Sequence, residues 1–126
     1  MIEKLLIADD EPGVRSLVKM TLEGDAFEIV EATDGPEAIA LAREHRPKAV
    51  LLDVMMPTLG GLDVCRALKT DPMTASIVVI MLTAKSQTAD REEGLAAGAD
   101  AYLTKPFSPM ALMAQIDELF SDSQDG

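Results

Sequence analysis

The chain has 126 residues, of which 48% are hydrophobic and 26% are charged, and its formal net charge at pH 7 is −11. This size and composition are those of one globular domain, and the acidic balance argues against a nucleic-acid-binding surface, which requires clustered Lys and Arg. A single cysteine, Cys65, excludes an internal disulfide, and no apolar run reaches the ~18 residues of a membrane span. We therefore expect a reduced, cytoplasmic protein that binds neither nucleic acid directly nor a membrane.

Five short apolar segments along the chain have the character of β-strands. Three of them are apolar at nearly every position, which is typical of strands covered on both faces, as in a parallel sheet. In chain order they are Lys4–Ala8, Phe27–Val30, Ala49–Leu52, Ile77–Leu82 and Asp100–Leu103.

Helical patterns follow each of these segments. The first begins near Pro12, and the last begins at Pro109 with Ser108 as its N-cap. Between them, helices are predicted over Pro36–His45, Leu62–Lys69 and Ala89–Ala97. The alternation (βα)5 indicates an α/β fold, a doubly wound five-stranded parallel sheet with helices on both faces. We expect residues 1–120 to form the domain and residues 121–126 (SDSQDG) to be a polar, disordered tail or the start of a linker.

Polar side chains stand at the ends of four predicted strands, where ligands bind in sheets of this kind. They are the pair Asp9 and Asp10, then Asp53, Thr83 and Lys105. Three neighbouring carboxylates repel one another, and a bound divalent cation relieves that repulsion. A site with few protein oxygen ligands suits Mg²⁺, which keeps several water ligands. A carboxylate beside such a metal can attack a phosphoryl group, while the metal and a lysine neutralise its charge.

Each residue of this set has a simpler explanation when it is taken alone. Asp10 or Glu11 could serve the N-terminus of the first helix, and Lys105 could be a solvated surface charge. Asp53 could be an ordinary turn residue. The occurrence of all of them at the ends of four strands of one sheet favours a common site.

The set and its spacing resemble the receiver domain of two-component response regulators, over about residues 3 to 120. The resemblance is carried by four stretches: "IADDEPG" with Asp9 and Asp10, "LLDVMMPTLGG" with Asp53, "MLTA" with Thr83, and "YLTKPF" with Lys105. It implies the flavodoxin-like fold of the chemotaxis regulators, with strand order 2-1-3-4-5.

The resemblance also implies a role for each matching residue. Asp53 would be the phosphoacceptor. Mg²⁺, with Mn²⁺ able to substitute, would bind to Asp9, Asp10, Asp53 and the backbone carbonyl of Met55. Lys105 would contact the phosphoryl group.

The same resemblance implies a conformational switch. The Thr83 hydroxyl and the Ala84 backbone N–H would bind the phosphoryl group, and Tyr102 would rotate into the space that Thr83 vacates. The alternative for Tyr102 is a half-buried packing residue. The Lys105–Pro106 bond would be the family's cis peptide.

The implied partners are a histidine kinase or phosphotransfer protein and a downstream protein. The downstream target would bind the face made by the fourth helix, fifth strand and fifth helix. We expect a phosphoacceptor that assists its own phosphorylation and dephosphorylation, not an enzyme, as a monomer or a phosphorylation-dependent dimer. A stand-alone receiver is favoured, because Ala101, Gln115 and Asp117 lack the charges of the winged-helix class. The alternative is the N-terminal receiver of a longer regulator with a DNA-binding or enzymatic output.

Two other classes share parts of this pattern. A haloacid-dehalogenase-type phosphatase also uses a strand-end aspartate and Mg²⁺, but it requires a second Asp where this chain has Met55. A flavodoxin-like carrier requires a Ser/Thr/Gly-rich phosphate loop where this chain has Asp9, Asp10 and Glu11.

Overall fold

The computed structural model describes residues 2–24, 27–84 and 98–125. One parallel sheet has the strand order β2-β1-β3-β4-β5, which confirms the predicted fold. Its strands are β1 (Glu3–Ala8), β2 (Phe27–Ala32), β3 (Ala49–Asp53), β4 (Val78–Ala84) and β5 (Ala101–Lys105). The described helices are α1 (Pro12–Leu22), α2 (Gly35–His45), α3 (Gly61–Thr70) and α5 (Pro109–Asp125). The helix predicted over Ala89–Ala97 lies outside the described residues.

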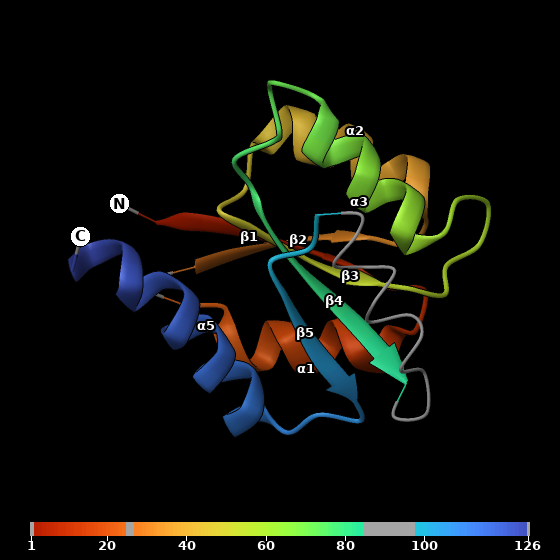
Figure 1. Ribbon diagram of the computed structural model, residues 1–126. Helices are drawn as coiled ribbons and strands as arrows, with labels where there is room; N and C mark the ends of the chain where they lie inside the picture. The colour runs from red at the N-terminus through yellow and green to blue at the C-terminus, as the bar shows by residue number, and fades with distance from the viewer. Residues whose placement is uncertain (1, 25–26, 85–97, 126) are drawn as a thin grey trace.

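The helices cover the sheet from both sides (Figure 1): α2 and α3 pack on one face, and α1 and α5 on the other. Because successive side chains of a strand point to opposite faces, each central strand contributes to two cores. In β1, Leu6 and Ala8 pack in the core under α2 and α3, whereas Leu5 and Ile7 pack in the core under α1 and α5. This double burial explains why the strands are apolar at consecutive positions.

All strands except β1 are longer at their carboxyl ends than the sequence pattern predicted. β4 continues through Thr83 to Ala84, and β5 continues to Lys105, so that both predicted site residues lie in the last two residues of a strand. Every residue of β3 is buried, including Asp53 at its end. Regular pairing of Ala84 with Lys105 then sets the two strand ends side by side.

The predicted helix starts at α1 and α5 are confirmed. Pro12 and Pro109 are the first residues of α1 and α5. Ser108 Oγ accepts a hydrogen bond of 3.1 Å from the Ala111 N–H, as expected of an N-cap.

The last helix extends beyond its apolar stripe. α5 continues to Asp125, into the segment 121–126 that we expected to be a polar, disordered tail or the start of a linker. The segment contains neither Pro nor Gly before Gly126, so nothing in its backbone chemistry ends the helix earlier.

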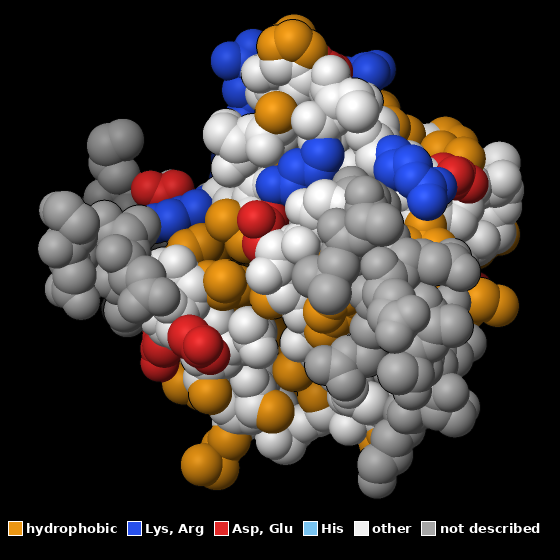
Figure 2. Space-filling view, in the orientation of Figure 1, with side chains coloured by type: hydrophobic (Ala, Val, Ile, Leu, Met, Phe, Trp, Pro, Cys, Tyr) orange, Lys and Arg blue, Asp and Glu red, His pale blue; other side chains and the backbone are white. Residues whose placement is uncertain are grey.

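Charged and apolar side chains are unevenly spread over the surface. In the view of Figure 2, Lys and Arg gather on the side of α2 and α3, while hydrophobic side chains are exposed on the side of α5. Met110 and Met113 of α5 are among the exposed large hydrophobic residues. Most of the basic charge visible in this view therefore lies away from α5.

A glycine at the start of α3 lets the helix pack directly on the end of β3. A Cβ atom at Gly61 would lie 2.9 Å from the Asp53 carbonyl carbon and 2.9 Å from the Val54 Cα. Both neighbours are backbone atoms and cannot rotate away. Gly61 thus fixes how closely α3 approaches the strand that carries Asp53.

Replacing this glycine should destabilise the fold. Gly61→Ala should lower the free energy of unfolding by about 1–3 kcal/mol through overpacking. Gly13→Ala is the matched control, because Gly13 also lies in a first helical turn but its Cβ would meet nothing within 4 Å. That control should be neutral or stabilising by up to about 1 kcal/mol. Urea unfolding of both variants measures the difference, and equal effects would contradict the role of Gly61.

Candidate functional site

The structure brings Asp9, Asp53 and Lys105 together at the carboxyl edge of the sheet. The Lys105 ammonium lies 2.7 Å from Asp9 Oδ2 and 3.4 Å from Asp53 Oδ2. Asp9 is fully buried and Asp53 nearly so. Residues from the ends of three different strands therefore meet in one contact network.

Each of the two buried carboxylates is oriented in the same way by its own backbone. Asp9 Oδ1 accepts a hydrogen bond of 2.9 Å from the N–H of Glu11, and Asp53 Oδ1 accepts one of 3.1 Å from the N–H of Met55. In both cases the donor is two residues ahead, as in an Asx-turn. The Oδ2 atoms are thereby directed toward Lys105.

Asp10 completes a group of three carboxylates that could hold a metal ion. One oxygen from each of Asp9, Asp10 and Asp53 lies within 4.8 Å of the others. Asp10 is exposed, in contrast to the two buried members. Such an all-oxygen cluster with an open side suits a hard cation that retains water ligands.

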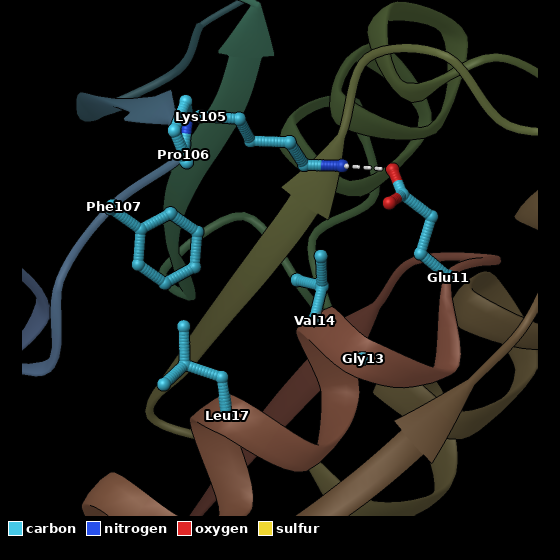
Figure 3. A pocket seen from close by; sticks show the side chains of 7 residues that line it. All are labelled: Glu11, Gly13, Val14, Leu17, Lys105, Pro106 and Phe107. Carbon is cyan, nitrogen blue, oxygen red and sulfur yellow. Dashed lines mark hydrogen bonds and ion pairs between the residues drawn. The ribbon is translucent and has the colours of Figure 1, made fainter.

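Glu11 also belongs to this network, and its contact with Lys105 was not predicted from the sequence. It is the N-cap residue of α1, but its side chain makes no capping hydrogen bond there. Its Oε1 instead lies 3.2 Å from Lys105 Nζ (Figure 3). Glu11 thus stands at the N-terminus of α1, as expected of an acid that favours the helix dipole, and its side chain also pairs with Lys105.

A cavity of about 410 Å³ opens beside the Glu11–Lys105 pair. Figure 3 shows Val14 and Leu17 of α1 on one side of it and Pro106 and Phe107 on the other. The ion pair thus forms the polar end of an otherwise apolar cavity.

Thr83 is a buried residue at the same edge of the sheet. It is 1% exposed, and its Oγ1 has no hydrogen-bond partner among the described residues. A buried hydroxyl without a partner is costly, so it is a candidate donor to a ligand.

Tyr102 is half-buried and packs against the core under α2 and α3. Both this packing role and the predicted switch role agree with that position. The backbone of Ala84 lies in β4, and the Lys105–Pro106 peptide is cis, as predicted.

Burial and repulsion perturb the titration of the central acid. Burial of its carboxyl, followed by the neighbouring Asp9, raises the pKa of Asp53 from 3.8 to about 6. Burial lowers the pKa of Lys105, but the hydrogen bond to Asp9 and the charges of Asp53 and Asp9 outweigh it and raise that pKa overall. The lysine therefore stays charged among these acids.

Comparison with known proteins identifies the family. The model of the response regulator receiver domain matches residues 5–117, and the chain belongs to this family. It is 38% identical over 125 residues to the DNA-binding response regulator MtrA of Mycolicibacterium smegmatis, covering 99% of this chain and 54% of that protein. The chain spans about half the length of the curated relatives it matches.

Solved structures agree with this assignment. The chemotaxis response regulator CheY4 of Vibrio cholerae is 31% identical, with a TM-score of 0.88 over 95% of this chain and 100% of that one. The receiver domain of sensor histidine kinase PA1611 from Pseudomonas aeruginosa is 27% identical, with a TM-score of 0.84 over 94% and 97% of the two chains. Its structure has a magnesium ion coordinated in the active-site cleft.

Within the part of the chain that the structure describes, no helix combines the length and the apolar character needed to cross a lipid bilayer.

The raised pKa of Asp53 predicts a pH dependence of stability in the metal-free protein. Because the folded state holds this proton more tightly than the unfolded state, ionising Asp53 destabilises the fold as the pH rises from about 4 through about 6. Asp53→Asn lacks this effect. Its stability relative to the wild type should therefore increase across that range and level off above it. Thermal unfolding in EDTA at several pH values measures the difference, and a constant difference would contradict the shift.

Proposed function

We propose that this domain accepts a phosphoryl group on Asp53 in a Mg²⁺-dependent reaction and switches a protein-binding face in response. The observation that carries the proposal is the contact network in which Asp9, Asp53 and Lys105 meet at the ends of β1, β3 and β5. Membership in the receiver family supports it.

The residues present fit a divalent cation. Asp9, Asp10 and Asp53 would hold Mg²⁺, or Mn²⁺ in its place, together with the backbone carbonyl of Met55. Asp9, Glu11 and Asp53 share the single ammonium of Lys105, and Asp10 adds a further carboxylate to the group, so these acids outnumber the lysine that is paired with them. The bound ion would supply positive charge to the acids and to the transferred group. The magnesium ion in the related PA1611 receiver supports this assignment.

Asp53 is the proposed nucleophile. A lone pair of its carboxylate oxygen forms the new O–P bond, while the P–N bond of a phosphohistidine breaks and its electron pair stays on the histidine nitrogen. Oδ1 is held by the Met55 N–H, which fixes the orientation of the carboxylate for the attack.

Lys105 would move from its contacts with the acids toward the phosphoryl oxygens. Its ammonium already lies 3.4 Å from Asp53 Oδ2, so the required shift is small. The same charge assists the attack of water on the phosphoryl group, so the domain assists both its own phosphorylation and its own dephosphorylation. It releases no product from a metabolite.

The Thr83 hydroxyl, which has no partner among the described residues, would donate a hydrogen bond to the phosphoryl group, and the Ala84 N–H would donate a second one. Tyr102 would then occupy the space left by Thr83. The affected face comprises the fourth helix, β5 and α5, of which the fourth helix lies outside the described residues. Such a local charge event acting on a two-state element is how switches of this kind work.

The proposed phosphodonor is a histidine kinase or phosphotransfer protein, and the reader of the switched face is a downstream protein. The proposed setting is the cytoplasm, and the proposed form is a monomer or a phosphorylation-dependent dimer. Both output arrangements expected from the sequence have counterparts: MtrA is about twice as long as the matched segment, while CheY4 is matched over its full length. The proposed phosphoacceptor chemistry does not depend on which of the two arrangements applies.

Labelling by a small phosphodonor tests the acceptor. With radioactive acetyl phosphate and Mg²⁺, the wild type should incorporate label, and Asp53→Asn should reduce incorporation to background. Asp63→Asn is the control, because Asp63 is an exposed acid of α3 outside the carboxylate group. Label that persists in Asp53→Asn, or that disappears equally in Asp63→Asn, would contradict the assignment.

A second variant tests the metal site. Asp10→Ala should weaken Mg²⁺ binding at least about tenfold, since the loss of a residue that only orients a ligand already costs that much. It should also stabilise the metal-free fold by relieving repulsion. Calorimetric Mg²⁺ titration and thermal unfolding measure the two effects, with Asp63→Ala as the control. Unchanged affinity together with unchanged stability would reject the site.

A further inference from the structure

Arg15 of α1 contacts the backbone of Asp9, beside the carboxylate cluster, and the sequence pattern did not predict this contact. Its side chain is 17% exposed, so it lies largely within the structure. Its Nη1 donates a hydrogen bond of 2.9 Å to the backbone carbonyl of Asp9, and its Nε donates one of 3.2 Å to Glu31 Oε1. The guanidinium thus bridges the end of β1 to β2.

The Asp9 carbonyl lies where β1 leaves the sheet. Ladder pairing ends at Ala8, which is paired with Ala32 in β2 and with Leu52 in β3. The Asp9 N–H still donates to the Ala32 carbonyl at 3.1 Å. The Asp9 carbonyl lies beyond this pairing, and Arg15 supplies the donor that a buried carbonyl requires.

This hydrogen bond constrains the next residue as well. The Asp9 carbonyl and the Asp10 nitrogen belong to one planar peptide unit. Holding the carbonyl therefore sets the direction in which the chain enters Asp10.

Asp10 depends on this constraint more than its neighbours do. Asp9 and Asp53 are each held by a backbone N–H and by Lys105. The Asp10 carboxylate is exposed, and no hydrogen bond or ion pair joins it to another described residue. Its place in the cluster is thus set by its backbone.

We propose that Arg15, braced by Glu31, is a positioning residue for the cation site, and that it acts by holding the Asp9–Asp10 peptide. The proposal rests on the proposed function, because it assumes that the carboxylate cluster binds Mg²⁺. The two hydrogen bonds of Arg15 go to the Asp9 carbonyl and to Glu31, so it would act on the cation only through the backbone.

If Arg15 acted only through its charge, its loss would change the Mg²⁺ affinity in the opposite direction from the change expected if it positions a ligand. A positive charge near the cluster repels a cation, so its removal alone should tighten Mg²⁺ binding. Loss of a group that orients a metal ligand weakens binding, typically by about 10–100-fold. The sign of the change therefore separates the two roles.

Lys19 provides a matched control. It lies one turn further along α1 and also binds Glu31, with Nζ 3.2 Å from Oε2, but it makes no hydrogen bond to Asp9. Lys19→Met removes a positive charge of the same helix and an ion pair with the same glutamate. It leaves the Asp9 carbonyl held.

The experiment is a calorimetric titration of MgCl2 into the wild type, Arg15→Met, Arg15→Lys and Lys19→Met, with thermal unfolding of each metal-free variant. Titrations are made well below the lowest unfolding temperature, so that a loss of stability does not appear as a loss of affinity. We expect Arg15→Met to weaken Mg²⁺ binding at least about tenfold, and Lys19→Met to leave it unchanged or tighter. Arg15→Lys should lie in between, because one ammonium keeps the charge but does not reproduce the planar two-sided bridge.

Two results would overturn the proposal. One is an affinity of Arg15→Met equal to or tighter than that of the wild type. The other is an equal weakening in Lys19→Met. If Asp10→Ala still weakens binding in either case, only the role of Arg15 fails. If the wild type binds no Mg²⁺, the proposed function fails together with it.

Discussion

The crowding of negative charge around one lysine is the constraint on which this edge of the molecule depends. Asp9, Glu11 and Asp53 all lie within 3.4 Å of the Lys105 ammonium. One ammonium does not compensate three acids, and two of these carboxylates are buried, where an uncompensated charge is most costly. Burial of the Asp53 carboxyl, followed by the charge of Asp9, raises the pKa of Asp53 in this setting.

The remainder of the fold keeps these charges from separating. The carboxylates of Asp9 and Asp53 are bound by N–H groups of their own loops, Gly61 allows α3 to press on the end of β3, and Arg15 holds the peptide that follows Asp9. Repulsion between the acids is therefore opposed partly by backbone groups, at Glu11, Met55 and Gly61, which carry no rotamer freedom, and partly by the side chain of Arg15.

The fold was predictable from the sequence because its signals are local. Consecutive apolar residues in Lys4–Ala8 and Ala49–Leu52 require two covered faces, and this excludes most alternatives to a doubly wound sheet. The proximity of Asp9, Asp53 and Lys105 was predictable for a related reason. Each follows or ends a predicted strand, and the carboxyl ends of parallel strands lie at one edge of the sheet, where ligands bind.

The roles of Glu11 and Arg15 were not predictable in the same way. Both depend on a side-chain rotamer and on tertiary contacts: Glu11 turns toward Lys105, which is distant in the sequence, and Arg15 reaches back to the Asp9 carbonyl and across to Glu31 of β2. No spacing rule encodes either choice. The extent of α5 escaped prediction for a different reason, since a polar composition suits an exposed helix as well as a coil.

The positions of β3 and β5 in the sheet have a consequence for dynamics. Asp53 ends β3, which is central and buried throughout, whereas Tyr102 lies on β5, at the edge of the sheet. Amide protons of β3 should exchange with solvent only when the whole domain unfolds, while those of β5 should exchange through smaller openings at the edge. The proposed covalent chemistry would thus take place on the strand that is expected to open least often, and the aromatic side chain proposed to respond lies on a strand that can open without unfolding the rest.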